Sequence, residues 1–165
     1  MKRKLPQNDS ISAYQRKATA ARRVGAGALC ACGESRPEAL ITGSDPTICA
    51  ECQRKKKGQT IMDDHHPAGK ANNPATVTVP VNDHRAELSV AQHDWPKQTR
   101  ENPDGSPLLA AAWCVRGFID QIIYLVKKLL LWIPEMLEAL DSFLAEKLEP
   151  KWWVGTPLAR FAPEQ

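Results

Sequence analysis

The middle of the chain alternates between short apolar runs and turn-forming residues. Residues 61–66 (IMDDHH) predict a short strand, and the β-branched run at residues 76–79 (TVTV) predicts a return strand. A loop rich in Pro, Gly and Asn separates the two. Asn82 is a favourable N-cap for a helix over residues 83–92. The expected order is therefore strand, loop, strand and helix.

Helical patterns flank this central part. Residues 10–24 have a helix-forming composition, with Ser10 or Ser12 as N-cap and a Gly-Ala-Gly stop at residues 25–27. Residues 93–107 are rich in turn signals and predict a linker. After it, residues 108–133 predict a long apolar helix, and Pro134 at the first position predicts a second helix over residues 135–148.

The long apolar helix raises the question of a membrane span, which needs about 20 residues with few charges. Arg116, Asp120, Lys127 and Lys128 interrupt it, and the first three share one narrow side of the helix. We therefore expect a packed helical pair and no membrane insertion. An exposed apolar side of this length would cause aggregation, so the preceding part of the chain, a second copy of the chain or a partner protein is expected to cover it.

These elements predict an α+β fold, with a small metal-stabilised core followed by the helical pair. The expected organisation is a basic N-terminal helix or arm (1–27), a core (28–92), a linker (93–107), the helical pair (108–150) and a tail (151–165). Residues 1–60 carry 12 Lys and Arg against 5 Asp and Glu, a net +7, although the whole chain is only +3. Such a basic third is typical of a nucleic-acid partner. With no secretory signal visible, we expect a cytoplasmic protein.

Four of the five cysteines form two close pairs, Cys30/Cys32 and Cys49/Cys52, separated by a loop. Zinc takes four thiolates at tetrahedral corners, and two short-spaced pairs supply them. A disulfide framework is disfavoured in a chain without an export signal. The pattern predicts a structural zinc site that supplies much of the folding energy of its segment. The fifth, Cys114, lies in the apolar helix and is expected to be a small buried residue.

Acidic and imidazole groups are crowded at the end of the first predicted strand, where Asp63, Asp64, His65 and His66 are consecutive. A hairpin can bring His84, near the start of the following helix, across from this strand. The combination suits hydrolysis of a phosphodiester, because one imidazole free of metal can take a proton from water. A divalent ion held by the other ligands would stabilise charge on the phosphate.

In this order, the cysteine pairs, the D-H-H-P-A-G-K-x-N-N stretch (64–73) and V-N-D-H-R (81–85) resemble the HNH, or ββα-metal, endonuclease family over residues 28–92. The resemblance implies a hydrolase that cuts DNA with Mg²⁺, Mn²⁺ or another divalent ion. It also implies that His66 is the general base, that His65 and His84 are metal ligands, and that Asp64 is a further ligand or orienting group. The four cysteines match the structural zinc knuckles of many members. Phages and mobile elements carry small proteins of this kind.

Two departures from the family pattern leave alternatives open. The family's middle Asn lies late in the loop, where this chain has Ala75 and Thr76, so Thr76 or the earlier Asn72 or Asn73 would brace the loop. The Asp-His-His triple also allows a second frame, with Asp64 as the ligand and His65 as the base.

Basic residues near the expected site are candidates for phosphate contacts, which position DNA without reading its sequence. They are Arg54, Lys55, Lys56, Lys57, Lys70 and Arg85. The alternative function is a non-catalytic zinc-binding adaptor for nucleic acid or protein, built on a degenerate form of the same fold.

Overall fold

The computed structural model describes residues 10–70 and 72–162. It divides the chain into two units, of which the first ends at Tyr124 and the second begins at Leu125. The predicted N-terminal arm is therefore described only from Ser10, since residues 1–9 lie outside the described part. The overall class is α+β, as predicted, with several helices and one two-stranded sheet.

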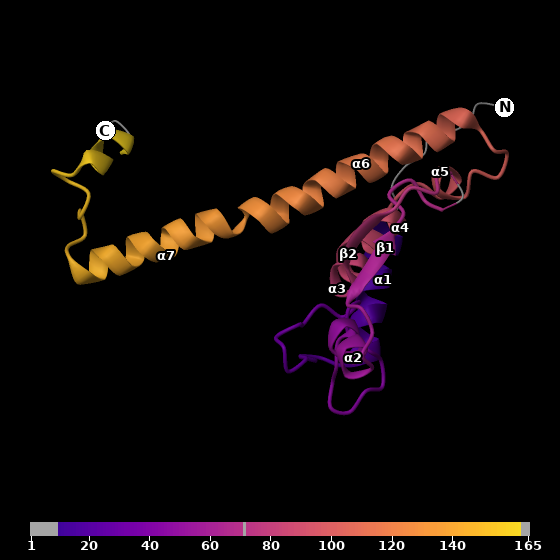
Figure 1. The fold of residues 1–165 in the computed structure, drawn as a ribbon, viewed down its shortest axis with the longest axis horizontal. Helices are drawn as coiled ribbons and strands as arrows, with labels where there is room; N and C mark the ends of the chain where they lie inside the picture. Colours follow the sequence, from indigo (N-terminus) through magenta and orange to yellow (C-terminus); the bar gives the residue numbers. More distant parts are fainter. Residues whose placement is uncertain (1–9, 71, 163–165) are drawn as a thin grey trace. The chain divides into compact units, whose positions relative to one another are not determined.

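The central hairpin consists of β1 (Met62–His65) and β2 (Val77–Pro80), which pair antiparallel with Asp63 opposite Val79 (Figure 1). Both strands were predicted, each within about a residue of its observed bounds. Successive side chains of a strand point to opposite faces, so Asp63 and His65 share one face and Asp64 lies on the other. His65 is buried and Asp64 is exposed, in agreement with this alternation.

The helix after the hairpin runs from Val81 to His93 as α3 (Val81–Asp83), η1 (His84–Leu88) and α4 (Ser89–His93). Its middle is π-helical, a local widening often found at functional sites. The predicted cap is wrong: the helix begins before Asn82, and that side chain is buried within the first turn. Leu88 packs with Val79 of the hairpin and with Tyr124, which fixes the helix on the sheet.

Two further helices precede the hairpin. Helix α1 (Ser10–Val24) has the predicted bounds. Helix α2 (Ala50–Lys56) begins directly after Cys49, whose sulfur accepts a hydrogen bond from the backbone N–H of Cys52 at 3.4 Å. Leu40 packs against Cys30 and Cys49 in a small apolar cluster. This cluster is too small to stabilise the segment alone, in keeping with a fold that depends on a metal ion.

The predicted linker is more ordered than expected. It contains the short helix α5 (Lys97–Glu101), and Trp95 is buried edge-to-face against Trp113, with ring centroids 5.5 Å apart. The Trp95 indole N–H donates to the Asp120 carboxylate at 2.9 Å. Asp120 therefore anchors α6 (Pro107–Leu130) to the core.

One side of α6 packs against the loop between β1 and β2. Gly117 and Trp113 are buried there, and Gly117 touches Pro67 while Trp113 touches Gly69. A Cβ on Gly117 would lie 1.9 Å from the carbonyl oxygen of Pro67. Only glycine fits this crossing of helix and loop.

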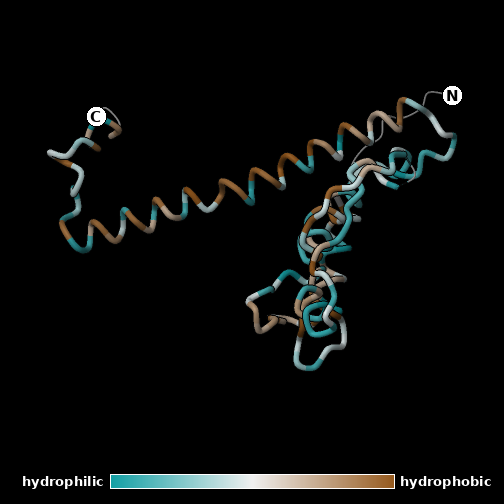
Figure 2. The backbone as a smooth tube through the Cα atoms, in the orientation of Figure 1, coloured by the Kyte–Doolittle hydropathy of each residue, from teal (hydrophilic) through white to brown (hydrophobic). Residues whose placement is uncertain are grey.

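The second unit contains the end of α6, helix α7 (Trp132–Lys147) and the 3₁₀ helix η2 (Pro157–Phe161). Pro134 is the third residue of α7 and not the first, as we had predicted, and it still lies in the first turn, where a missing N–H costs little. Figure 2 shows apolar positions recurring along α6 and α7, and α7 buries no residue. We had expected its leucines to be packed.

By length and composition alone, one helical stretch of the described residues, Pro107–Lys147, is apolar enough to cross a membrane. In its most apolar window 22% of the residues are buried inside the protein. The absence of membrane insertion stays a prediction.

Gly117→Ala tests the contact between α6 and the loop. In an open helix this change stabilises by about 1 kcal/mol, but here the methyl group meets the Pro67 carbonyl. We expect the free energy of unfolding, from urea titration, to fall by about 1–3 kcal/mol. Ala111→Gly, at an exposed position of the same helix, is the control and should cost only its helix propensity. A more stable Gly117→Ala protein would show that the contact is not close.

Candidate metal centre and histidine site

The four cysteines predicted to bind zinc lie together. The sulfur atoms of Cys30, Cys32, Cys49 and Cys52 are all within 4.8 Å of one another, and Cys32 and Cys49 are 3.6 Å apart. Tetrahedral zinc with sulfur ligands at about 2.3 Å requires sulfur atoms about 3.8 Å apart. The quartet therefore has the composition and the spacing of a structural zinc site.

Local backbone structure places each pair. In the first pair, the N–H of Gly33 donates to the carbonyl of Cys30 and the N–H of Cys30 to that of Glu34, which closes a tight turn. Gly33 has a φ of 93°, a conformation that favours glycine. In the second pair, Cys49 caps α2 and Cys52 lies in its first turn, where the positive end of the helix favours thiolates.

The thiols of the quartet differ in pKa. The backbone N–H of Cys32 is the main influence that lowers the pKa of the Cys30 thiol to about 6. Hydrogen bonding with the Cys32 and Cys49 sulfurs raises the pKa of Cys52 to about 12. Four crowded thiolates need a counter-charge, and a divalent cation supplies it.

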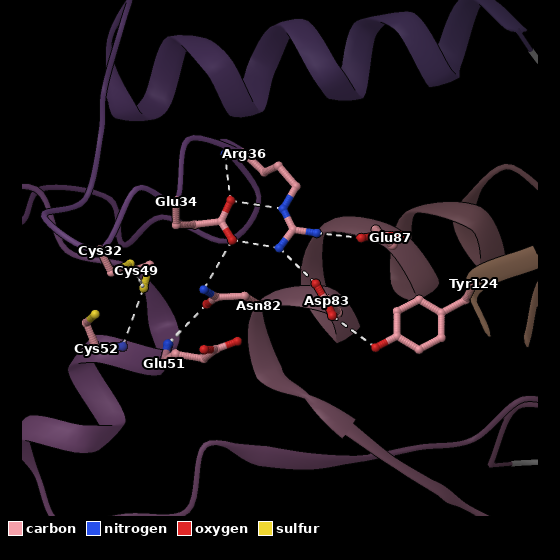
Figure 3. Close-up of polar contacts among 10 residues, drawn as sticks. All are labelled: Cys32, Glu34, Arg36, Cys49, Glu51, Cys52, Asn82, Asp83, Glu87 and Tyr124. Atoms are coloured by element: carbon pink, nitrogen blue, oxygen red, sulfur yellow. Dashed lines mark hydrogen bonds and ion pairs between the residues drawn. The ribbon is translucent and has the colours of Figure 1, made fainter. Parts of the chain in front are cut away.

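Beside the quartet, the Arg36 guanidinium joins three carboxylates (Figure 3). It donates to Glu34 at 2.6 and 2.9 Å, to Asp83 at 2.8 Å and to Glu87 at 2.6 Å. The hydrogen bonds from Arg36 lower the pKa of Glu34 to about 2. Glu34 belongs to the loop between the cysteine pairs, whereas Asp83 and Glu87 belong to the helix that carries His84.

Two more side chains extend this network, as Figure 3 shows. The side-chain oxygen of Asn82 accepts a hydrogen bond from the backbone N–H of Glu51. The side-chain nitrogen of Asn82 donates a hydrogen bond to the Glu34 carboxylate at 3.2 Å. The Tyr124 hydroxyl donates to Asp83 at 2.9 Å. The metal-binding loop, α2 and α6 are thereby all tied to the first turn of the helix.

The histidine site lies where β1 meets this helix. The rings of His65 and His84 lie edge to face, with centroids 5.1 Å apart. His84 Nδ1 is 2.7 Å from the Asp63 carboxylate. His65 is only 2% exposed, and burial lowers its pKa to about 4, so the imidazole is neutral at neutral pH and keeps a lone pair.

The other predicted members of the site lie differently. Asp64 is on the opposite face of β1 and accepts a hydrogen bond from the Thr78 hydroxyl. His66 follows the strand and is partly exposed, and its carbonyl accepts from Gln92 Nε2 at 2.8 Å. The structure thus brings His65 and His84 together with Asp63, which sequence reasoning did not select. The two-residue period of the strand was the signal that favoured Asp63 over Asp64.

Asp63, His65 and His84 are a chemically suitable donor set for a divalent ion. In the part of the chain that the structure describes, however, only the cysteine quartet gathers three donor groups within 4.8 Å of one another. The imidazole of His84 is instead oriented by Asp63, in the way that a carboxylate orients a ligating histidine.

The six candidate phosphate-binding residues fall into two groups. Arg54 is turned toward β1, where it donates to the Met62 carbonyl at 2.8 Å and pairs with Asp63 at 3.5 Å. The others are exposed: Lys55, Lys56, Lys57, Lys70 and Arg85. In the loop, Asn72 donates to the Ala68 carbonyl and Asn73 accepts from the Ala75 N–H, so the early asparagines brace it.

Comparison with known proteins gives no match to a protein-family model, a curated protein or a solved structure. The resemblance to HNH endonucleases therefore rests on the sequence motifs alone.

Zinc content tests the cysteine site. Purified protein should hold about one zinc ion per chain, and Cys49→Ser should remove it and unfold the surrounding loop, because three thiolates leave the tetrahedron open. Cys114→Ser, which changes the remaining cysteine, is the matched control and should keep the ion. Elemental analysis together with circular dichroism measures both effects. Folded wild-type protein without bound metal would contradict the assignment.

The Arg36 network can be tested by Arg36→Met, which leaves three carboxylates without their cation. We expect a loss of about 2–3 kcal/mol in unfolding free energy, less than for a fully buried pair because a third of the Arg36 side chain is exposed. The matched control, Arg16→Met, removes a more exposed pair with Asp94 and should cost under about 1 kcal/mol. Equal losses of unfolding free energy for the two variants, measured by urea titration, would show that the Arg36 network stabilises the fold no more than an exposed ion pair does.

Proposed function

We propose that the chain is a metal-dependent endonuclease that hydrolyses DNA phosphodiester bonds. The observation that supports this most is the pairing of His65 on β1 with His84 in the first turns of the following helix, next to Asp63. A hairpin and a helix that meet at histidines form the arrangement expected of a ββα-metal nuclease.

The chain's own residues have distinct parts in this proposal. Asp63 accepts a hydrogen bond from His84 Nδ1–H, which leaves the Nε2 lone pair free for a metal ion. His65 stays neutral because it is buried and is the second ligand. A divalent ion such as Mg²⁺ or Mn²⁺, held by these groups, would supply electrostatic stabilisation of the charge on the phosphate.

We assign the general base to His66. His65 is nearly inaccessible to water at 2% exposure, whereas His66 is partly exposed directly after it. A base must reach the water from which it takes a proton. The exposed lysines at 55–57 and Lys70, with Arg85, would attract the DNA backbone without reading its sequence.

The second candidate is a zinc-stabilised adaptor that binds DNA or protein without cutting. The observation in its favour is that Asp63, His65 and His84 do not form a closed three-ligand cluster, whereas the structural cysteines do. A domain that had lost catalysis would keep the zinc and the basic surface.

Cleavage of supercoiled plasmid with Mg²⁺ or Mn²⁺ separates the two candidates. His66→Ala and His84→Ala should each slow cleavage by about 100-fold or more, because removal of a base or ligand affects the transition state. DNA affinity, from fluorescence anisotropy, should change little. His93→Ala, an exposed histidine outside the site, is the control. Wild-type protein that binds DNA but fails to cleave it with every divalent ion tested would favour the adaptor.

A further inference from the structure

Helix α6 has two different sides. One side is buried in the first unit through Trp113, Gly117, Gln121 and Tyr124. The other side is apolar and exposed, and it includes Phe118, which is 65% exposed. In a monomer this second side costs free energy, because contiguous apolar surface is in contact with water.

A subset of the exposed apolar residues follows a seven-residue repeat that runs from α6 into α7, while others, such as Ile123 and Leu137, lie beside it. We define the apolar seam by the two core positions of this repeat. The first position is apolar and exposed at every repeat: Leu108, Val115, Ile122, Leu129, Met136 and Phe143. The second position, three residues later, holds Phe118, Leu125 and Trp132 in the centre, alanine at 111 and 139, and Glu146 at the C-terminal end of α7. A strict seven-residue repeat is the signature of helices that pack against other helices as coiled coils.

The backbone allows this repeat to continue across the junction of the two helices. Leu131 keeps a right-handed helical conformation, with φ −65° and ψ −27°, and its N–H donates to the Lys127 carbonyl. The Trp132 indole N–H donates to the Leu129 carbonyl at 2.9 Å. Pro134 lies off the seam, so it does not interrupt the apolar positions.

Charge distribution indicates which partner fits. Helix α6 contains three basic residues and one acidic residue, Asp120. Helix α7 contains four acidic residues and one basic residue, Lys147. Two parallel copies would place like charges together, whereas two antiparallel copies place the basic end of α6 beside the acidic α7. Lys128 and Glu135 are seven residues apart and flank the seam at the same position of the repeat, where charges pair between helices.

We propose that a second copy of this chain docks antiparallel along the apolar seam, with Lys128 of each copy opposite Glu135 of the other. In this register Leu129 packs on Trp132, Phe118 packs on Phe143, and the large Ile122 meets the small Ala139. Two of these pairs bring large apolar residues together, and in the third the small Ala139 leaves room for Ile122. The proposal is independent of catalysis and holds for a nuclease and an adaptor alike.

A lipid surface fits the same helices less well. Helices that lie on membranes carry Lys and Arg on their polar side, whereas the polar side of α7 is acidic with Glu135, Glu138 and Asp141. Anionic lipids would repel it. In addition, protein covers the inner side of α6 up to Tyr124, so lipid cannot surround that helix.

The experiment is a charge exchange on the full-length, zinc-loaded protein, followed by sedimentation equilibrium. Wild-type protein should be a dimer at micromolar concentration. Lys128→Glu or Glu135→Lys should each weaken the dimer by about tenfold, because two attractive pairs become repulsive. The double variant, with both changes, should restore the wild-type dissociation constant. Lys127→Glu, one residue away and off the seam, is the matched control and should leave dimerisation unchanged.

Zinc content and circular dichroism establish that each variant is folded. A monomeric wild-type protein, or a double variant no better than either single one, would overturn the proposal. So would flotation of monomeric protein with vesicles of phosphatidylcholine and phosphatidylglycerol, which would assign the seam to lipid. The double variant keeps the test decisive even where a single variant is unstable.

Discussion

The bonds from Arg36 to Glu34, Asp83 and Glu87 connect parts of the chain that otherwise have little reason to stay together. The metal-binding loop has only a small apolar cluster, and the hairpin and its helix form another small core. A guanidinium with several donors in a fixed plane can hold carboxylates from both. Because Asp83 precedes His84, the position of the histidine site depends on this contact.

The two candidate metal sites therefore differ in physical character. The cysteine quartet is local: a glycine turn and a helix terminus place the pairs, and a bound ion would complete a segment that has only a small apolar cluster. The histidine site is not local, because β1 supplies Asp63 and His65 and the helix after β2 supplies His84. Its geometry depends on the register of the hairpin and on what holds the helix in place.

The C-terminal helices pose the opposite problem, since they have more apolar surface than the chain itself covers. The inner side of α6 is fixed by close fits such as Gly117 on Pro67 and by the Trp95–Asp120 hydrogen bond. The outer side and α7 remain exposed. The second copy that we propose would remove part of this surface from water, which is the usual driving force of helix association in solution.

The sequence alone determined the elements whose cause is local. Cysteine spacing predicted the quartet, β-branched runs predicted both strands, and composition predicted α1 with its observed bounds. The tertiary structure decided what depends on distant residues: Arg36 joined to Asp83, Asn82 as a bridge instead of a cap, and Asp63 instead of Asp64 beside His84. Local propensity acts over a few residues, whereas these contacts join groups that only hairpin register, helix packing and burial bring together.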